Sequence, residues 1–270
     1  MMITTRSIAT LKKRWVCSIS DINICLENNE SGFCSLWTEH IKIKNCADLY
    51  INKKFSGDYF FNRLSNIRCY DSESAVEESI KIFFENGSNC YVYVQYYDTI
   101  LEDKLLKMGF TLLDTMQVLK YSNKKESYND KIHVSTIDIN LMPLWIDVFC
   151  RSFNVIKWKS EVERIIKMHF NELTLLVSYI KDNYSLIPVG CAALFNRYDL
   201  MGLYCLGTES PYRGQGLAKE IIKVSLDIAR QQKFDFLFLQ TFSNEGFIHF
   251  YRKIGFQVIY EKKIYALNRR

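Results

Sequence analysis

A cluster of glycines lies in the segment LGTESPYRGQGLA, which spans residues 206–218. Three of the chain's eleven glycines, Gly207, Gly214 and Gly216, fall between an apolar run typical of a strand and an amphipathic run typical of a helix. The first backbone N–H groups of a helix have no partner within the helix, and the helix dipole adds partial positive charge there. A strand, a glycine-rich loop and a helix in this order therefore predict a site for a phosphate-bearing ligand.

The loop follows the pattern R-x-x-G-x-A, with Arg213, Gly216 and Ala218 at the defined positions. It is not a P-loop, because no Gly-Lys-Ser/Thr follows, and the dinucleotide-binding pattern G-x-G-x-x-G does not occur after a strand. Gly214 and Gly216 would let the backbone approach an anion closely, and Arg213 adds a cation beside it. Taken alone, the loop fits a tight strand-to-helix connection about equally well.

A second spaced motif lies downstream, in SNEGFIHFYRKIGF over residues 243–256. Asn244 is followed seven positions later by Tyr251, and Gly255 and Phe256 begin four positions after that. Together with the loop, this motif resembles the GNAT family of N-acetyltransferases, whose Q/R-x-x-G-x-G/A loop binds acetyl-CoA. The resemblance covers residues 131–267 in detail.

The resemblance implies acetyl-CoA as co-substrate and no metal. It implies direct attack of an amine on the thioester in a ternary complex, with backbone N–H groups around residues 206–208 stabilising the carbonyl oxygen. It also implies Tyr251 as the general acid that protonates the departing CoA thiolate. The implied donor-binding residues are Leu206, Gly207, Thr208, Arg213, Gly214, Gln215, Gly216, Leu217, Ala218 and Asn244. The structural alternatives are a core tyrosine at Tyr251 and an N-cap at Asn244.

The general base stays unassigned. Gly202 occupies about the position at which members of the family often carry a carboxylate on the central strand. Asp199, Tyr204, Glu209 and His249 are nearby in sequence, but Asp199 fits a hairpin turn, Glu209 a loop cap and His249 a helix surface. A water chain is the alternative.

The elements that must position these motifs follow a mixed α/β order. Residues 121–131 are strongly polar and predict a linker. Beyond it, strands are predicted at 132–137, 173–181, 185–196, 200–208 and 234–240, helices at 141–153, 160–170, 217–231 and 244–254, and hairpin-like strands at 256–267. The first half repeats part of this order, with a helix at 74–85, a strand at 89–95, a helix at 99–108 and a Gly-Phe pair opening the next strand.

We therefore predict an α/β fold of two GNAT-like domains, each with a mixed, mostly antiparallel central sheet flanked by helices. The first, at 1–125, is expected to be degenerate and non-catalytic, because it reads SNIRCYDSESA where the second has its glycine loop, and Leu105 stands in place of Tyr251. The second, at 131–270, is expected to be catalytic. The first domain would pack on the second or shape its substrate cleft.

Composition limits the class of protein. The net charge is +5 and the basic clusters are short, so no nucleic-acid partner is expected. No apolar stretch approaches the roughly 20 residues of a membrane span, and the first residues lack a signal-peptide core, which predicts a cytoplasmic protein without a membrane partner. The nine cysteines and four histidines show no metal-ligand spacing. Cys191 and Cys205 lie in apolar runs and are predicted to be buried thiols.

The sequence thus predicts an acetyl-CoA-dependent N-acetyltransferase that acts on a primary amine of a small molecule, with a homodimer as one possible assembly. One alternative is transfer to a lysine or N-terminal amine of a protein. Another is a non-catalytic acyl-CoA-binding or interaction protein, because the base is missing and one half has lost its loop. The acceptor and the length of the acyl chain stay open.

Overall fold

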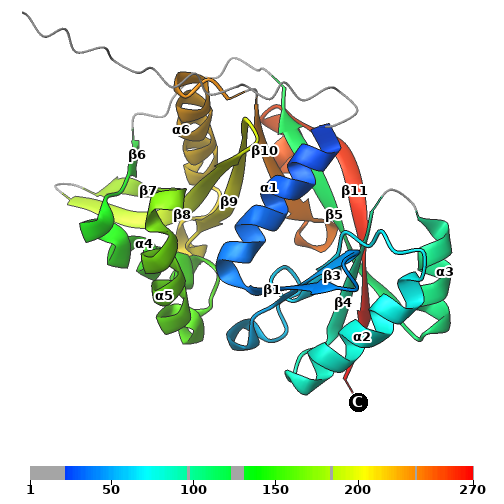
Figure 1. Ribbon diagram of the computed structural model, residues 1–270. Coiled ribbons are helices and arrows are strands. Elements are labelled where there is room, and N and C mark those ends of the chain that lie inside the picture. Colours follow the sequence, from blue (N-terminus) through cyan, green and yellow to red (C-terminus); the bar gives the residue numbers. More distant parts are fainter. Residues whose placement is uncertain (1–21, 96–97, 123–130, 183–184, 235, 270) are drawn as a thin grey trace, which may run out of the picture.

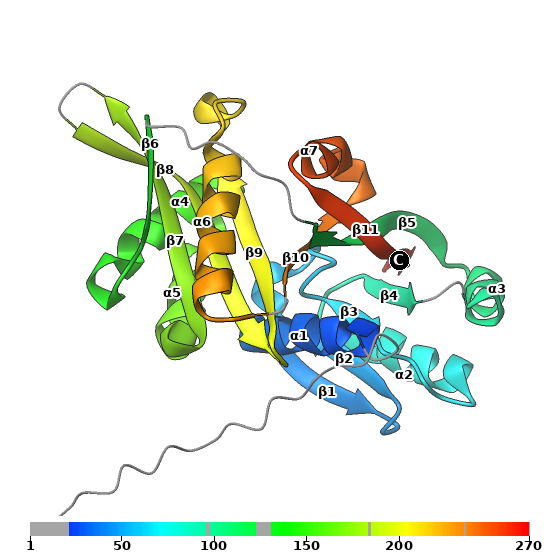
Figure 2. The same ribbon diagram turned by 90° about the horizontal axis from the view of Figure 1, so that it is seen from above.

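The computed structural model describes residues 22–95, 98–122, 131–182, 185–234 and 236–269. These residues form a mixed, mostly antiparallel sheet flanked by helices, as predicted (Figures 1 and 2). The described strands are β1 (Glu39–Ile43), β2 (Ala47–Ile51), β3 (Arg63–Ser65), β4 (Cys90–Gln95), β5 (Thr111–Tyr121), β6 (Ile132–Thr136), β7 (Leu173–Asp182), β8 (Ser185–Arg197), β9 (Leu200–Thr208), β10 (Leu237–Phe242) and β11 (Phe256–Leu267).

Helices pack on the sheet along its whole width, with α1 across the middle (Figures 1 and 2). They are α1 (Ile22–Trp37), α2 (Ser72–Glu85), α3 (Thr99–Lys107), α4 (Met142–Ser152), α5 (Lys159–His169), α6 (Leu217–Gln231) and α7 (Ile248–Lys253). Short 3-10 turns that matter below are η1 (Lys53–Phe55), η3 (Ile156–Trp158), η5 (Ser210–Tyr212) and η6 (Ser243–Glu245).

The two halves of the chain repeat one arrangement and exchange their last strands. The sheet order is β1-β2-β3-β4-β11-β5-β10-β9-β8-β7-β6. In the first half β3 is parallel to β4, and in the second half β9 is parallel to β10. The last strand of the first half, β5, pairs with β10 of the second, whereas β11 pairs with β4 of the first. β5 and β11 also pair with each other at the centre, where Figure 1 shows them side by side in green and red.

The repeated Gly-Phe pairs have a structural reason. Gly109 follows α3 and Gly255 follows α7, and both adopt a left-handed conformation, with φ of +87° and +105°. Glycine reverses the chain there without the strain that a Cβ would cause. Each pair therefore ends a helix and begins one of the two exchanged strands. The proposed domain division between residues 125 and 131 stays a prediction, and residues 123–130 of the linker lie outside the described residues.

Three predicted elements differ from the structure. Residues 256–267 form one long strand instead of a hairpin, because both edges of β11 have partners, β4 and β5. The helix predicted at 244–254 begins only at Ile248, because Gly246 adopts a φ of +72° and separates η6 from α7. β10 begins at Leu237 instead of residue 234, after Lys233 takes a φ of +62°.

The core joins the two halves. Phe33 and Trp37 of α1 pack against the second half, with ring centroids 6.0 Å from Phe195 of β8 and 5.8 Å from Phe149 of α4. The cluster of buried apolar side chains that contains them draws on both halves. The protein therefore buries one shared interior where the halves meet.

Beside this interior lies a buried network of charges. Lys262 of β11 contacts Glu30 of α1 at 2.5 Å and Glu27 at 3.0 Å, and Arg63 of β3 contacts Glu30 at 2.7 Å. All four side chains are almost completely buried. Because buried charges are stable only when paired, this network fixes α1 to β3 and β11.

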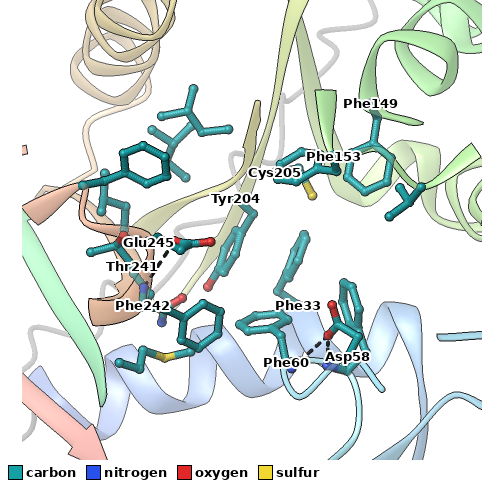
Figure 3. Close-up of a pocket in the computed structure, with 18 of the residues that line it drawn as sticks. Phe33, Asp58, Phe60, Phe149, Phe153, Tyr204, Cys205, Thr241, Phe242 and Glu245 are labelled. Carbon is teal, nitrogen blue, oxygen red and sulfur yellow. Dashed lines mark hydrogen bonds between the residues drawn. The ribbon is translucent and has the colours of Figure 1, made fainter. Parts of the chain in front are cut away.

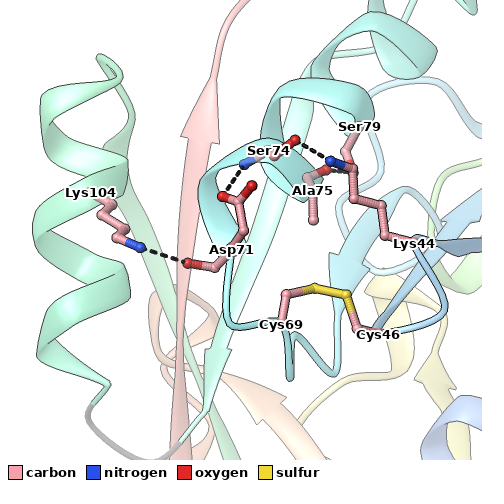
Figure 4. Close-up of a disulfide and its surroundings, with 9 residues drawn as sticks. Lys44, Cys46, Cys69, Asp71, Ser74, Ala75, Ser79 and Lys104 are labelled. Atoms are coloured by element: carbon pink, nitrogen blue, oxygen red, sulfur yellow. Dashed lines mark hydrogen bonds between the residues drawn. A yellow bond between two sulfur atoms is a disulfide. The ribbon is translucent and has the colours of Figure 1, made fainter.

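Cys46 and Cys69 form a disulfide that joins the start of β2 to the segment ahead of α2 (Figure 4). Disulfides are uncommon in cytosolic proteins. The cytoplasmic location therefore stays a prediction. Within the described ranges, the structure contains no helix with the length and apolar character to cross a bilayer.

Candidate active site

Two parallel strands diverge at the centre of the second half. The parallel register of β9 and β10 runs from Met201 and Leu237 to Leu203 and Leu239 and ends there. Just beyond, β9 bulges at Cys205, whose φ is +52°. A cavity of about 310 Å³ opens between the diverging strand ends. Its lining from β9, β10 and the following segment includes Tyr204, Leu206, Thr241, Phe242, Glu245 and Tyr251.

The first half forms the opposite wall of this cavity. Phe33 of α1, Asp58 and Phe60 from the segment between η1 and β3, and Met116 of β5 all line it. Figure 3 shows Phe33, Phe60 and Asp58 across the cavity from Glu245 and Thr241. α4 and the segment after it add a third wall. Side chains of both halves therefore line this cavity, and its use as a substrate cleft stays a prediction.

The glycine loop lies directly after β9. Gly214 and Gly216 adopt φ values of +78° and +93°, so both positions need glycine for the backbone conformation itself. Gly216 is the N-cap of α6 and has no side chain that could occupy the free N–H groups of the first turn. The loop therefore presents the uncapped positive end of a 15-residue helix.

Arg213 holds this loop in place. Its Nε donates to the carbonyl oxygen of Thr208 at 3.0 Å, and a terminal guanidinium nitrogen donates to that of Ser152 in α4, also at 3.0 Å. The structure thus gives Arg213 a positioning role besides the predicted one as a cation beside the anion. In the same loop, Gln215 donates from Nε2 to the carbonyl of Pro211 at 3.5 Å.

The remaining predicted donor residues have distinct neighbours. Leu206 lines the cavity, whereas Leu217 is buried against the sheet and Ala218 is half-buried. At Gly207 an added Cβ would lie 2.7 Å from Phe153 and 2.8 Å from Ser152. The close approach that Gly207 permits is therefore that of α4 onto β9.

Tyr251 lines the cavity from α7 and is 8% exposed. Its ring packs edge-on against Phe256 at 5.9 Å. Burial, and then the negative charge of Glu245, raise the pKa of the Tyr251 phenol well above its usual value. The phenol therefore keeps its proton at neutral pH, as a general acid must before it donates.

Asn244 lies at the edge of the site and contacts β5. Its backbone N–H donates to Asp114 Oδ1 at 3.2 Å, and its Nδ2 donates to the carbonyl of Leu113 at 3.2 Å. The predicted N-cap role is wrong, because Phe247 occupies the N-cap position of α7. These contacts fix η6 to a strand that comes from the first half.

The structure explains why Gly202 replaces a carboxylate. An added Cβ would lie 2.4 Å from the ring of Tyr204 and 2.9 Å from Oδ1 of Asn29. The Tyr204 hydroxyl donates to that same oxygen at 2.9 Å. Asn29 belongs to α1, so the first half fills the space that a side chain at Gly202 would need.

Apart from Tyr204, the acid-base candidates near the loop in sequence lie in a turn, in an ion pair and on a helix surface. Asp199 takes a φ of +58° in the turn between β8 and β9. Glu209 pairs with Arg151 at 2.9 Å. His249 is exposed on α7. The two predicted thiols, Cys191 and Cys205, are buried and half-buried, and burial raises the pKa of each.

Two carboxylates that the sequence motifs did not indicate also line the cavity, Asp58 and Glu245. Burial raises the pKa of both, although opposing hydrogen bonds from backbone N–H groups reach each one. Glu245 stands beside Asn244 in the recognised motif, whereas Asp58 lies in the first half and no spacing links it to the site. In the ranges that the structure covers, no group of three or more metal-binding side chains is present.

Residues 143–256 match the sequence profile of the Acetyltransferase (GNAT) family. Over this segment the chain is similar to GNAT acetyltransferases. The segment runs from α4 to the first residue of β11 and so includes the diverging strands, the glycine loop and Tyr251. Acetyl transfer is the activity class that this match supports.

Solved GNAT structures have the same fold. The chain resembles a GCN5-related N-acetyltransferase from Kribbella flavida, with a TM-score of 0.65, 12% identity and coverage of 94% of this chain and 98% of that one. It also resembles a GCN5-related N-acetyltransferase from Sphaerobacter thermophilus, with a TM-score of 0.65, 16% identity and coverage of 82% of this chain and 75% of that one. A tandem GNAT protein from the clavulanic acid biosynthesis pathway matches with a TM-score of 0.54, 8% identity and coverage of 74% of this chain and 70% of that one. Among curated proteins, none matches significantly in sequence.

Proposed function

We propose that the protein transfers the acetyl group of acetyl-CoA to a primary amine of a small molecule, by direct attack in a ternary complex. The observation that carries this proposal is the divergence of β9 and β10, which opens a cavity lined by Tyr251 beside the R-x-x-G-x-A loop. The proposal also rests on the family match of residues 143–256.

The loop and the helix behind it suit the phosphates of the donor. Gly214 and Gly216 hold the backbone in left-handed conformations ahead of α6, and no side chain caps the start of that helix. A pyrophosphate at this end would meet partial positive charge and hydrogen-bond donors together. The acetyl group would then extend along β9 towards the bulge at Cys205, where the strand has left β10.

Tyr251 is the general acid in this proposal. When the amine nitrogen forms its bond to the carbonyl carbon, the carbon–sulfur bond breaks and the CoA sulfur leaves as a thiolate. The Tyr251 hydroxyl is buried and protonated at the cavity wall, so it can supply the proton. Such proton transfer typically contributes 10²- to 10⁴-fold to the rate.

The wall from the first half favours a small acceptor. Phe33, Phe60 and Asp58 close the side of the cavity opposite β10, and a lysine on a folded protein would have to pass this wall. An open groove would be expected for a protein substrate. We therefore propose a free amine as the acceptor.

The experiment has two measurements. Calorimetric titration tests whether acetyl-CoA binds, and release of free CoA thiol in the presence of a panel of amines tests transfer. We expect binding and amine-dependent release by the natural chain, and release by Tyr251→Phe slowed at least tenfold. Absence of acetyl-CoA binding would overturn the proposed function, whereas binding without release by any amine would support the non-catalytic alternative.

A further inference from the structure

One side of the cavity is built from aromatic rings. Opposite β10 and η6, the wall consists of Phe33, Phe60, Phe61, Phe149, Phe153 and Trp158. The rings pack on one another: the centroids of Phe60 and Phe61 are 5.2 Å apart, and those of Phe149 and Phe153 are 4.9 Å apart. Aromatic walls favour a flat apolar ligand, because ring-to-ring contacts add to the gain from burying apolar area.

The charges of the cavity are all of one sign. Its lining contains the carboxyl groups of Asp58 and Glu245, and it includes no lysine, arginine or histidine among the described residues. Asp58 is half-buried and Glu245 lies in an exposed turn, and a positive charge bound close to either carboxyl group would favour its ionised form. An aromatic cavity with two acids therefore fits a ligand that carries a positive charge.

Asp58 is the acid on the aromatic side. Its Oδ1 accepts hydrogen bonds from the backbone N–H groups of Phe60 and Phe61, both at 2.9 Å. These two bonds fix the carboxyl group, and no hydrogen bond from the residues that the structure describes reaches Oδ2, which could accept from a ligand. In Figure 3 the second oxygen of Asp58 points away from these two N–H groups.

Glu245 is placed differently. Its Oε2 accepts from the Thr241 hydroxyl at 3.2 Å and from the backbone N–H of Phe242 at 3.4 Å. Glu245 lies across the cavity from Asp58, and its negative charge raises the pKa of Tyr251, the residue that would protonate the departing CoA thiolate. A cation bound there would compete with the donor, so Asp58 is the better partner for an acceptor.

We infer that the acceptor is a primary amine carried by an aromatic or similarly flat apolar group, and that Asp58 Oδ2 binds its ammonium. This inference rests on the proposed function and names its substrate class. In the reaction, the ammonium gives one proton to Asp58, and the neutral amine attacks the thioester carbonyl. The C–N bond forms, the C–S bond breaks, and Tyr251 protonates the CoA sulfur. The nitrogen then loses its second proton, which returns through solvent to the Tyr251 oxygen, and Asp58 releases its own proton to solvent, leaving the amide and free CoA thiol.

Two further features favour Asp58 as the proton acceptor. Asn29 of the first half occupies the space that a carboxylate at Gly202 would need. Asp58, also from the first half, supplies a carboxylate to the cavity instead. Burial raises the pKa of its carboxyl group, while the backbone N–H groups of Phe61 and Phe60, and then the charge of Arg63, oppose that rise. A carboxylate with a raised pKa is a stronger base than an exposed one.

The test measures binding before turnover. Calorimetry on the full chain uses 2-phenylethylamine, its neutral counterpart 2-phenylethanol, and the non-aromatic diamine putrescine. The inference predicts that phenylethylamine binds at least about tenfold tighter than either of the others, from the charge-assisted hydrogen bond and the aromatic contacts. Asp58→Asn should abolish the preference for amine over alcohol, because it keeps the oxygen that accepts from Phe60 and Phe61 but removes the charge.

The control variants separate this role from a general effect. Asp103→Asn, an exposed change on α3, should leave the preference unchanged, and Glu245→Gln should keep it. Tighter binding of putrescine, or a preference that survives Asp58→Asn, would overturn the inference. Acetylation of putrescine alone would leave the proposed function intact and refute only the aromatic substrate class. Asp58-dependent binding of phenylethylamine without CoA release would refute transfer and support the amine site.

Discussion

The side-chain amide of Gln240 in β10 donates from Nε2 to Oε2 of Glu30 in α1 at 2.6 Å, across 210 positions of the chain. Gln240 lines the cavity, and Glu30 is held in turn by Lys262 and Arg63. Burial would raise the pKa of the Glu30 carboxyl, but the charges of Lys262 and Arg63 outweigh it and lower that pKa. The strand that carries one wall of the cavity is therefore tied to an ion network that joins both halves.

The buried network is expected to be a main support of stability. Lys262→Met leaves Glu27 and Glu30 buried without their shared cation, and we expect a loss of about 3–5 kcal/mol in the free energy of unfolding. Urea denaturation followed by circular dichroism measures it. The control Arg164→Gln breaks an exposed pair with Glu161 and should cost about 0–1 kcal/mol. Equal losses in the two variants would contradict this account.

Tyr251→Phe is expected to lower the maximal rate without weakening acetyl-CoA binding. The change removes only the hydroxyl from a buried ring, so the packing against Phe256 remains. We expect kcat to fall by about 10²- to 10⁴-fold, with the dissociation constant of acetyl-CoA within about twofold. Tyr198→Phe, in the half-exposed turn between β8 and β9, is the matched control and should retain full activity. A Tyr251→Phe enzyme as fast as the natural chain would remove the phenol from the mechanism.

The role of the glycine loop can be separated from backbone strain. Gly214 and Gly57 have similar φ values, +78° and +92°, and at both positions an added Cβ would meet no atom within 4 Å. Gly214→Ala and Gly57→Ala should therefore each lose about 1–2 kcal/mol of stability. Only Gly214→Ala should also weaken acetyl-CoA binding, because it alone alters the backbone before α6. Calorimetric titration of both variants decides this, and equal affinities would contradict a phosphate site in the loop.

Asp58 should stabilise the fold less than an asparagine at neutral pH. Burial raises the pKa of its carboxyl group above the unfolded value, and the positive charge of Arg63 opposes this rise. Glu245 is the other acid of the cavity, and its pKa is raised as well. A group with a raised carboxyl pKa destabilises the folded state once pH rises above its unfolded pKa of about 4. Asp58→Asn should therefore raise the melting temperature at pH 7, and the gain should vanish near pH 3. A loss at pH 7 that is absent at pH 3 would reverse the sign and contradict the argument.

The sequence predicted best those features for which the local backbone conformation requires a particular residue type, above all glycine. Gly214, Gly216, Gly109 and Gly255 all occupy left-handed positions, and their spacing marked the loop and the repeat before any fold was known. The periodicity of apolar residues likewise located most helices and strands, because helix and strand faces bury at fixed intervals.

The sequence did not predict which distant segments of the chain come together in the fold. Asp58 reaches the cavity only because the first half folds against the second, and no local pattern encodes that contact. In the same way, β11 was expected to fold on itself, since its pattern does not reveal that β4 and β5 flank it. Strand partners and cavity walls from distant segments depend on tertiary packing, to which local propensity contributes little.

The exchange of β5 and β11 makes the chain a natural candidate for a split protein. If each half were expressed separately, its sheet would lack the strand that the other half supplies, and the edges of β4 and β10 would be exposed. Unpaired edges of this kind tend to recruit another strand. Fragments cut in the linker should therefore be insoluble or unfolded alone, and co-expression should restore a complex by mutual complementation.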